Sequence, residues 1–212
     1  MTLAIPRLDR TTAEGRGLTI ADFLVPIRVG ERLNVRARHI ALIVAGALFI
    51  FLTAQIYIAR APVPLTGQTF GVLLVGGALG GRRGFAAIAL YVVLGLVGLP
   101  FFAEGKGGSA VILGVTGGYL IGFMLAGAIV GRLAEFGWDR HLGGAIGMMV
   151  IGSLAIYGIG LPWLSVVGGY SLQDTIAYGL TPFLAWDIAK LVVAAALFPA
   201  VWWVVGRRPE DR

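Results

Sequence analysis

Apolar runs long enough to form membrane-spanning helices alternate with short polar segments along most of the chain. A helix crosses a bilayer with roughly 20 mostly apolar residues. The candidate spans are His39–Ile58, Thr69–Leu79, Phe85–Leu99, Val111–Leu133, Leu142–Leu164 and Pro182–Val205. The second run is too short for an ordinary crossing, and we expect its helix to extend into the flanking residues. The pattern predicts an all-α integral membrane protein, a six-transmembrane-helix bundle with both termini on one side.

The composition agrees with a bundle embedded in lipid. Of the 212 residues, 58% are apolar and only 13% are charged, and the mean hydropathy is +0.87. Soluble domains carry about a quarter charged residues. The 33 glycines fit the same interpretation, because small residues allow membrane helices to approach closely. The length allows one such domain.

The basic residues indicate which side of the bundle faces the cytoplasm. If the N-terminus is inside, fourteen of the 17 Lys and Arg residues fall on the inner side. Only Arg60 and Lys106 fall in outer loops, and Lys190 lies within a span. Cytoplasmic segments of membrane proteins carry such an excess, so we expect both termini to be cytoplasmic. The same distribution accounts for the net charge of +6 without a nucleic-acid partner.

We expect the chain to divide into a cytoplasmic N-terminal tail over residues 1–37, a six-helix transmembrane substrate-binding domain over residues 38–206 and a cytoplasmic C-terminal tail over residues 207–212. The first tail lacks the apolar core of a signal peptide. Within it, Ile20–Ile27 predicts a short helix on the membrane surface. The outer loops are longer than the inner turns and carry aromatic residues, Gly and Pro. Because function tends to lie on loops held by a rigid scaffold, we expect the outer face to bind the ligand.

Two ionisable residues, Asp187 and Lys190, lie within the last span. Charged groups in a span are costly and are functional candidates by default. Their i, i+3 spacing places them on one helix face, where their charges can pair. Pro182 suits the first turn of this helix, which puts Asp187 roughly two turns below the outer surface. The pair either contacts polar groups of a ligand or is a self-satisfied ion pair between helices. The cost of a purely structural pair in lipid favours the ligand contact.

Small residues form two further patterns. The run Gly117–Tyr119 stands in a glycine-dense segment of the fourth span, where the backbone can approach a ligand. Glycine spacing alone favours ordinary close packing of helices there. Ala37, Ala41 and Ala45 recur every four residues at the cytoplasmic start of the first span. This alanine stripe offers a flat surface on which another helix, of this chain or of a partner, can dock.

Several classes of chemistry lack the residues they need. The chain has no cysteine, which excludes disulfides, thiol catalysis and Cys-based metal sites. His39 and His141 form no metal cluster, so no metal is expected. No segment fits the phosphate-binding loop of an ATPase. Ser153 has no histidine within a span to act as its base, so a membrane-embedded enzyme is the weaker alternative. A channel would need rings of pore-lining charge, which the sequence does not provide.

Four motifs together resemble the BioY family, the biotin-specific substrate-binding (S) components of energy-coupling factor (ECF) transporters. They are Pro62–Thr69 (PVPLTGQT), Gly98–Ala103 (GLPFFA), Thr116–Tyr119 (TGGY) and the pair Asp187 and Lys190. The similarity runs from about Ala61 to Pro199. One departure is Val115, where the family usually has proline before the threonine of TGGY.

The resemblance implies a six-helix bundle in the bacterial cytoplasmic membrane that captures biotin from outside and needs no cofactor. It also implies three partner subunits, one transmembrane coupling subunit and two ATPase subunits, with the alanine stripe contacting the coupling subunit. With this resemblance, we expect the following substrate-binding residues: Asp187, Lys190, Thr66, Gln68, Tyr91, Gly117, Gly118 and Tyr119. An S component for another vitamin stays open, because the ion pair alone does not select the ligand.

Overall fold

The computed structural model describes residues 19–24, 32–59 and 61–205 of the chain. Its longer helices are α2 (Arg32–Ala54), α3 (Gln68–Leu79), α4 (Gly81–Leu96), α6 (Gly117–Glu135), α7 (Leu142–Gly168) and α9 (Thr181–Val205). Its shorter helices are α1 (Ile20–Leu24), η2 (Ala103–Gly105), α5 (Ser109–Leu113), η3 (Trp138–Arg140) and α8 (Leu172–Gly179). Between α2 and α3, β1 (Tyr57–Ile58) pairs antiparallel with β2 (Leu65–Thr66).

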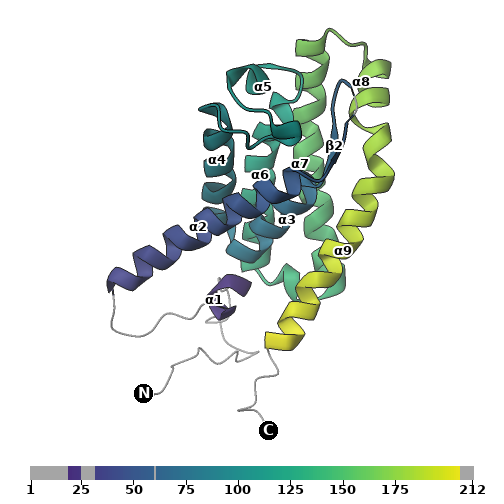
Figure 1. Ribbon diagram of the computed structural model, residues 1–212. Coiled ribbons are helices and arrows are strands. Elements are labelled where there is room, and N and C mark those ends of the chain that lie inside the picture. The colour runs from purple at the N-terminus through teal and green to yellow at the C-terminus, as the bar shows by residue number, and fades with distance from the viewer. Residues whose placement is uncertain (1–18, 25–31, 60, 206–212) are drawn as a thin grey trace, which may run out of the picture.

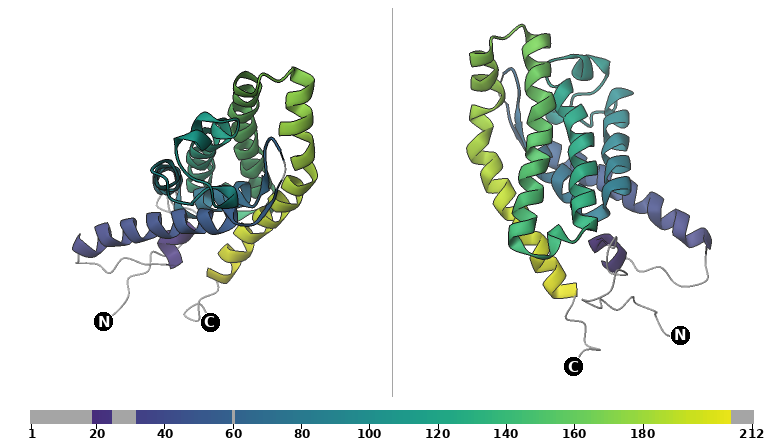
Figure 2. Two further views of the ribbon diagram at one scale, coloured as in Figure 1. Left: turned by 45° about the horizontal axis from the view of Figure 1, so that its top comes forward. Right: turned by 180° about the vertical axis from the view of Figure 1, so that it is seen from behind.

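The longer helices form an elongated bundle with α6 at its centre (Figure 1). α6 packs along α7 and also contacts α3 and α4. α9 packs on α7 and α3, and α2 lies across α3 and α4 at a steep angle to the other helices. Two further views show that α2 projects beyond the bundle (Figure 2). α1 and the C-terminal end of α9 lie at one end of the bundle, and α5 and the α7–α8 turn lie at the other.

Glycines allow three helices to meet backbone to backbone at the centre of the bundle. A Cβ at Gly76 of α3 would lie 2.9 Å from the carbonyl oxygen of Gly127 in α6. A Cβ at Gly84 of α4 would lie 2.9 Å from the Cα of Gly76. Ile88 and Val130 are fully buried on the same helices. Close backbone approach of this kind is how helices associate in lipid, where apolar burial between helices gives little driving force.

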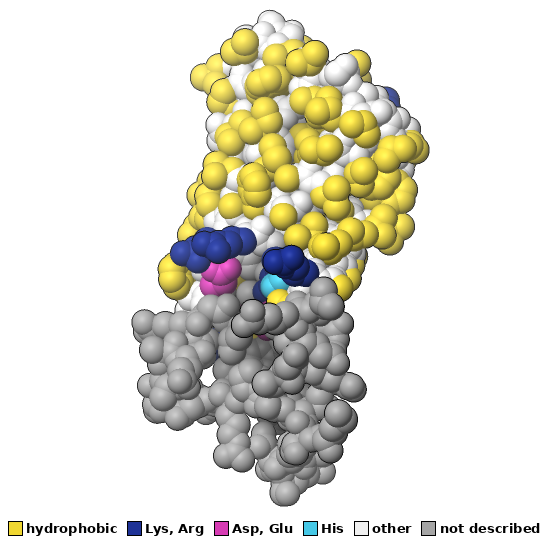
Figure 3. All heavy atoms as spheres, turned by 90° about the vertical axis from the view of Figure 1, so that its left-hand side faces the viewer, with side chains coloured by type: hydrophobic (Ala, Val, Ile, Leu, Met, Phe, Trp, Pro, Cys, Tyr) yellow, Lys and Arg dark blue, Asp and Glu magenta, His cyan; other side chains and the backbone are white. Residues whose placement is uncertain are grey.

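The surface of the bundle is apolar over most of its length, as contact with lipid requires. Hydrophobic side chains cover the face drawn in Figure 3, and Lys and Arg side chains gather in a band at its lower edge. Ile40, Leu52, Leu154 and Val193 are each more than half exposed. Apolar patches on soluble proteins rarely exceed a few hundred Å². The surface and the helices together make the chain a multi-pass membrane protein.

Within the described part of the chain, four stretches of helix are long and apolar enough to cross a membrane: Val35–Ala54, Gly117–Glu135, Leu142–Gly168 and Leu172–Val204. They correspond to the first, fourth, fifth and sixth runs of the sequence pattern. The second and third runs also form helices, but α3 has 12 residues and α4 has 16. The expected extension of the second helix into its flanks is wrong, because α3 begins only one residue earlier, at Gln68. A mostly helical membrane fold is therefore confirmed, whereas six crossings remain a prediction.

Local structure departs from the sequence pattern in several places. The first run is helical only to Ala54, and its last two residues, Tyr57 and Ile58, form β1. The fourth run is divided into α5 and α6, because the Gly114 carbonyl accepts a hydrogen bond from Trp163 Nε1 at 2.9 Å and leaves the helical path. α8 is a separate short helix, capped where the Ser171 side chain accepts from the Asp174 N–H at 3.1 Å. In the N-terminal tail, α1 covers the first part of the predicted surface helix, and residues 25–27 lie outside the described part of the chain.

Candidate ligand-binding site

A cavity of about 300 Å³ lies among the ends of the helices, beneath the segment that follows β1. Its volume is within the range of small-molecule sites, which are mostly apolar with a few converging polar groups. Most of its lining is apolar, and the walls include Pro62, Val63, Phe102, Leu120, Phe123, Ile156 and Phe183. These residues come from the β1–β2 connection, the loop after α4, and helices α6, α7 and α9. Elements distant in sequence therefore enclose one site.

Lys190 supplies the main polar contact inside this cavity. Its Nζ pairs with Asp187 Oδ1 at 2.5 Å, so the predicted i, i+3 ion pair is present. Nζ also donates to the Thr66 carbonyl oxygen at 2.8 Å and to Thr69 Oγ1 at 2.6 Å. The two charged side chains are only 11% and 13% exposed. All three donors of the ammonium group therefore have partners within the chain.

Asp187 connects three helices from a position behind Lys190. It accepts a hydrogen bond from Thr69 Oγ1 of α3 at 3.1 Å and another from the Tyr157 hydroxyl of α7. The carboxylate thus holds α9 against both neighbours while it neutralises Lys190. Buried charges are tolerated when they are paired and their remaining positions are hydrogen-bonded. This geometry fits the interhelical reading of the pair, and it also fixes the ammonium group beside the cavity.

A second network of hydrogen bonds links Thr66 at the end of β2 to Gln68 and Tyr91. The Thr66 hydroxyl donates to Gln68 Oε1 at 2.9 Å, and Gln68 Nε2 donates to the Tyr91 hydroxyl at 2.5 Å. Tyr91 is completely buried on α4, with its ring edge-on to Phe102 at 5.7 Å between centroids. Tyr91 itself does not line the cavity, but its hydrogen bond holds the side chain of Gln68, which does.

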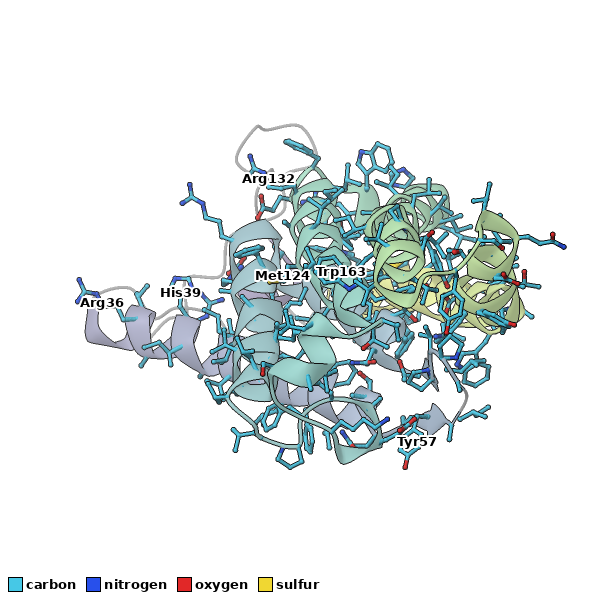
Figure 4. All side chains as sticks on the ribbon, turned by 90° about the horizontal axis from the view of Figure 1, so that it is seen from above. Arg36, His39, Tyr57, Met124, Arg132 and Trp163 are labelled. Atoms are coloured by element: carbon cyan, nitrogen blue, oxygen red, sulfur yellow. The ribbon has the colours of Figure 1, made fainter. Side chains whose placement is uncertain are left out.

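The glycines of the TGGY run serve packing. A Cβ at Gly117 would lie 1.7 Å from the Ile112 carbonyl oxygen, and one at Gly118 would lie 2.2 Å from Trp163 Cβ. Only glycine permits α6 to pass so close to α5 and α7. The view from above shows Trp163 where these helices meet (Figure 4). The next residue, Tyr119, lines the cavity and donates from its hydroxyl to the Gly179 carbonyl oxygen at 3.0 Å.

The structure thus separates the predicted binding residues into two layers. Thr66, Gln68, Tyr119 and Lys190 line the cavity. Asp187, Tyr91, Gly117 and Gly118 are outside the lining and lie next to residues that form it. Ala37, Ala41 and Ala45 are exposed on α2, away from the cavity.

Polar residues of the cavity lining that sequence reasoning missed include Thr69, Lys106, Tyr157 and Thr116, the first residue of the TGGY run. Thr69 lines the cavity and bridges Lys190 and Asp187, and its place at the end of the PVPLTGQT motif is a signal that could have found it. Lys106 also lines the cavity and pairs with Glu104. It is one of only two basic residues assigned to outer loops, which is also a signal. Tyr157 is one aromatic residue in a long apolar run, and nothing local marks it.

Across the described residues, no group of three or more His, Asp or Glu side chains could hold a metal ion. A mostly apolar cavity with a few fixed polar groups, enclosed by helices that cross the membrane, defines a solute-binding membrane protein of the transport class. The chain belongs to the BioY family, whose sequence profile matches residues 28–207. This family consists of transport proteins, so the chain is not an enzyme.

The curated relatives cover most of the chain. A biotin transporter BioY from Thermotoga maritima is 42% identical over 161 residues, which are 74% of this chain and 87% of the relative. A probable biotin transporter BioY from Pyrococcus horikoshii is 40% identical over 166 residues, 77% of this chain and 95% of the relative. A biotin transporter BioY from Rhizobium etli is 32% identical over 168 residues, 76% of this chain and 89% of the relative.

A solved structure shares the fold. It is the S component for biotin from an ECF-type ABC transporter, determined by crystallography at 2.1 Å. The superposition has a TM-score of 0.71 at 24% sequence identity and covers 81% of this chain and 94% of the other. A helical membrane fold of the kind expected from the sequence resemblance is therefore confirmed, whereas the count of six helices stays a prediction.

Proposed function

We propose that this chain is the biotin-binding subunit of a vitamin uptake system and that the cavity beside Lys190 holds biotin. The observation that carries the proposal is this cavity. Its few polar groups are held in place by two hydrogen-bond networks, one around Lys190 and one from Thr66 through Gln68 to Tyr91. The relatives from Thermotoga maritima and Pyrococcus horikoshii, which are named a biotin transporter and a probable biotin transporter and are 42% and 40% identical to this chain over the aligned residues, support the choice of ligand. The chain crosses the bacterial cytoplasmic membrane six times in this proposal, with both termini inside.

Biotin has a polar ureido ring, an apolar sulfur ring and chain, and a carboxylate, and the cavity offers a complement to each. The ureido group presents two N–H donors and one carbonyl acceptor. Lys190, Thr66, Thr69 and Gln68 offer both donors and acceptors in one region of the lining. The apolar walls suit the sulfur ring and the chain. We assign the ureido ring to the Lys190 region, with Asp187 acting through Lys190.

Lys106 suits the carboxylate of biotin. It lines the cavity from the loop after α4, and its side chain is 60% exposed beside Glu104. A carboxylate only accepts hydrogen bonds, so a lysine at the mouth complements it better than the mixed polar groups around Thr66. We expect Lys106→Ala to weaken biotin binding about tenfold, the effect of losing one charged hydrogen bond. Binding of biotin methyl ester should not change. Equal losses for both compounds would refute the assignment.

The first experiment is isothermal titration of the purified, detergent-solubilised chain with biotin, with thiamine and riboflavin as controls. Tight binding of biotin alone is the expected result. Binding of another vitamin in place of biotin would make the chain an S component for that vitamin, with the same architecture. Failure to bind any of the three would refute the proposed function.

The proposal includes an ECF module as partner, with a transmembrane coupling subunit and two ATPase subunits. The alanine stripe of Ala37, Ala41 and Ala45 is exposed on α2, which leaves it free to contact another helix. Replacing both Ala41 and Ala45 by Trp should abolish biotin uptake and spare biotin binding. Val192→Trp, at an exposed position on α9, is the matched control and should affect neither. Loss of binding in the alanine variant would show a role in folding.

A further inference from the structure

A second cluster of charged side chains lies far from the cavity, where α1 meets α2 and α4. Asp22 Oδ1 accepts from Arg38 Nη2 at 2.9 Å and from Arg83 Nη1 at 2.8 Å, and Oδ2 accepts from Arg83 Nη2 at 2.7 Å. The Thr19 N–H and hydroxyl also donate to Oδ2, at 3.1 and 2.9 Å. Arg83 in turn donates from Nε to the Leu79 carbonyl oxygen at 2.8 Å. One carboxylate therefore joins three segments that are far apart in sequence.

This cluster is largely shielded from solvent. The side chains of Arg38, Arg83 and Asp22 are 7%, 15% and 19% exposed. The adjacent Ile20 and Ala21 are 5% exposed, and α1 packs against α3 and α9. Burial on its own raises the pKa of the Asp22 carboxyl, but hydrogen bonds from the two arginines outweigh burial and hold that pKa well below its usual range. The carboxylate is therefore ionised at every physiological pH.

Arg38 gives the N-terminal half of α2 its fully buried contact, while Leu42 and Ile43 pack against the core only partly buried. From Val35 to Ala45, Arg38 is the single buried position in the described chain, and full burial resumes at Gly46. Figures 1 and 2 show this half of α2 extending past the other helices, and Figure 4 shows Arg36 and His39 on the projecting part. The Arg38 guanidinium also donates to the Ala21 carbonyl oxygen at 3.2 Å. The projecting half of α2 is thus tied to α1, and through Asp22 to α4.

We propose that Asp22 is a positioning residue that sets the angle of α2 to the bundle by joining Arg38 and Arg83. The angle matters because the same half of α2 carries the exposed alanine stripe, so this inference rests on the proposed docking of a coupling subunit there. Without the carboxylate, two poorly solvated guanidinium groups face each other and repel. The projecting half of α2 then loses the ion pair of the one fully buried residue in its described part, Arg38. The exposed alanine stripe no longer has a fixed orientation relative to the bundle.

A distance measurement tests the mechanical part of this inference directly. The chain contains no cysteine, so Arg36→Cys on α2 and Arg82→Cys on α4, both at exposed positions, can be spin-labelled without background. We expect one narrow distance distribution in the otherwise unchanged protein and a broadened or shifted one in Asp22→Asn. Asp22→Glu keeps the charge and should restore the narrow distribution. Asp174→Asn makes the same charge change on exposed α8 and should leave the distribution unchanged.

Transport measurements test the functional part in the same variants, expressed with the coupling and ATPase subunits. Asp22→Asn should lower biotin uptake about tenfold, as expected for loss of a charged hydrogen-bonding partner, and leave biotin affinity within twofold. An unchanged distance distribution, unchanged uptake, or an equal loss of binding and uptake would each overturn the inference. If the chain with Asp22 intact bound no biotin, the proposed function would fail, and the distance measurement would still decide whether Asp22 fixes α2.

Discussion

Removing the ammonium group of Lys190 distinguishes a ligand contact from a purely structural ion pair. Lys190→Met keeps the length of the side chain but leaves the Asp187 carboxylate, only 13% exposed, without a cation. It also removes the donors to the Thr66 carbonyl oxygen and Thr69 Oγ1. Removing one partner of a buried pair typically costs about 3–5 kcal/mol. We expect a loss of that size in the free energy of unfolding.

The double variant Asp187→Asn/Lys190→Met removes both charges together. An asparagine at this position can still accept a hydrogen bond from one of the Thr69 and Tyr157 hydroxyls and donate one to the other. We therefore expect the double variant to recover most of the lost stability, to within about 1 kcal/mol of the unchanged chain, since neutral replacement of a buried pair is often tolerated. Thermal unfolding in detergent, followed by fluorescence of the five tryptophans, measures both variants.

Biotin binding should behave differently from stability in these variants. Both lack the Lys190 ammonium group at the cavity, so both should bind biotin at least tenfold more weakly, the equivalent of about 1.4 kcal/mol. Isothermal titration at a temperature where the double variant is folded gives the affinity. If the double variant regained affinity together with stability, Lys190 would have only a structural role. If Lys190→Met were as stable as the unchanged chain, the energetic reasoning about the pair would be wrong.

Two further predictions concern packing and pH. Gly118→Ala places a methyl group 2.2 Å from Trp163 Cβ and should lower the free energy of unfolding by about 1–3 kcal/mol. At Gly158 an added methyl group meets nothing within 4 Å, so Gly158→Ala should be neutral. Thermal unfolding in detergent measures both variants. Burial raises the pKa of Asp139 from 3.8 to about 6, despite a hydrogen bond from Trp202 at 2.6 Å. The folded chain therefore binds the Asp139 proton more tightly than the unfolded chain does. The resulting contribution to the free energy of unfolding is full below pH 3.8 and is lost as the pH rises through 6. Relative to Asp139→Asn, the unchanged chain should lose about 2.4 kcal/mol between pH 4 and 7 in pH-dependent unfolding, and parallel curves would contradict the assignment.

The long helices could be predicted because lipid imposes a simple rule on their sequences. α2, α6, α7 and α9 each present an apolar run that satisfies the length of a bilayer, and α9 begins at Thr181, with Pro182 in its first turn as expected. The break before α6 could not be predicted, because it depends on a hydrogen bond from Trp163 to Gly114, across two helices. The steep angle of α2 likewise depends on tertiary contacts that periodicity does not encode.

The candidate site was predictable only in part, for a related reason. Thr66, Gln68 and Lys190 were found through a charged pair and a motif, which are visible along the chain. The layer behind them depends on which helices become neighbours. Tyr157 meets Asp187 because α7 packs on α9, and Tyr91 meets Gln68 because α4 packs on α3. Such partners have no signature in one sequence, since their spacing is set by the assembled bundle.

The hydrogen bond from Lys190 to the Thr66 carbonyl oxygen has a consequence for how solute enters and leaves. The Lys190 ammonium group on α9 has three protons, and one of them forms a hydrogen bond to Thr66 in the short strand β2. The segment that covers the cavity leads directly into this strand. A ligand oxygen that approaches this nitrogen must replace a partner already there. If the ligand oxygen replaces the Thr66 carbonyl oxygen, arrival of the solute breaks the hydrogen bond that holds the segment between β1 and β2 over the cavity. The Thr66 contact and the solute contact would then be alternatives at a single nitrogen atom, so binding of the solute would itself release the segment above the cavity.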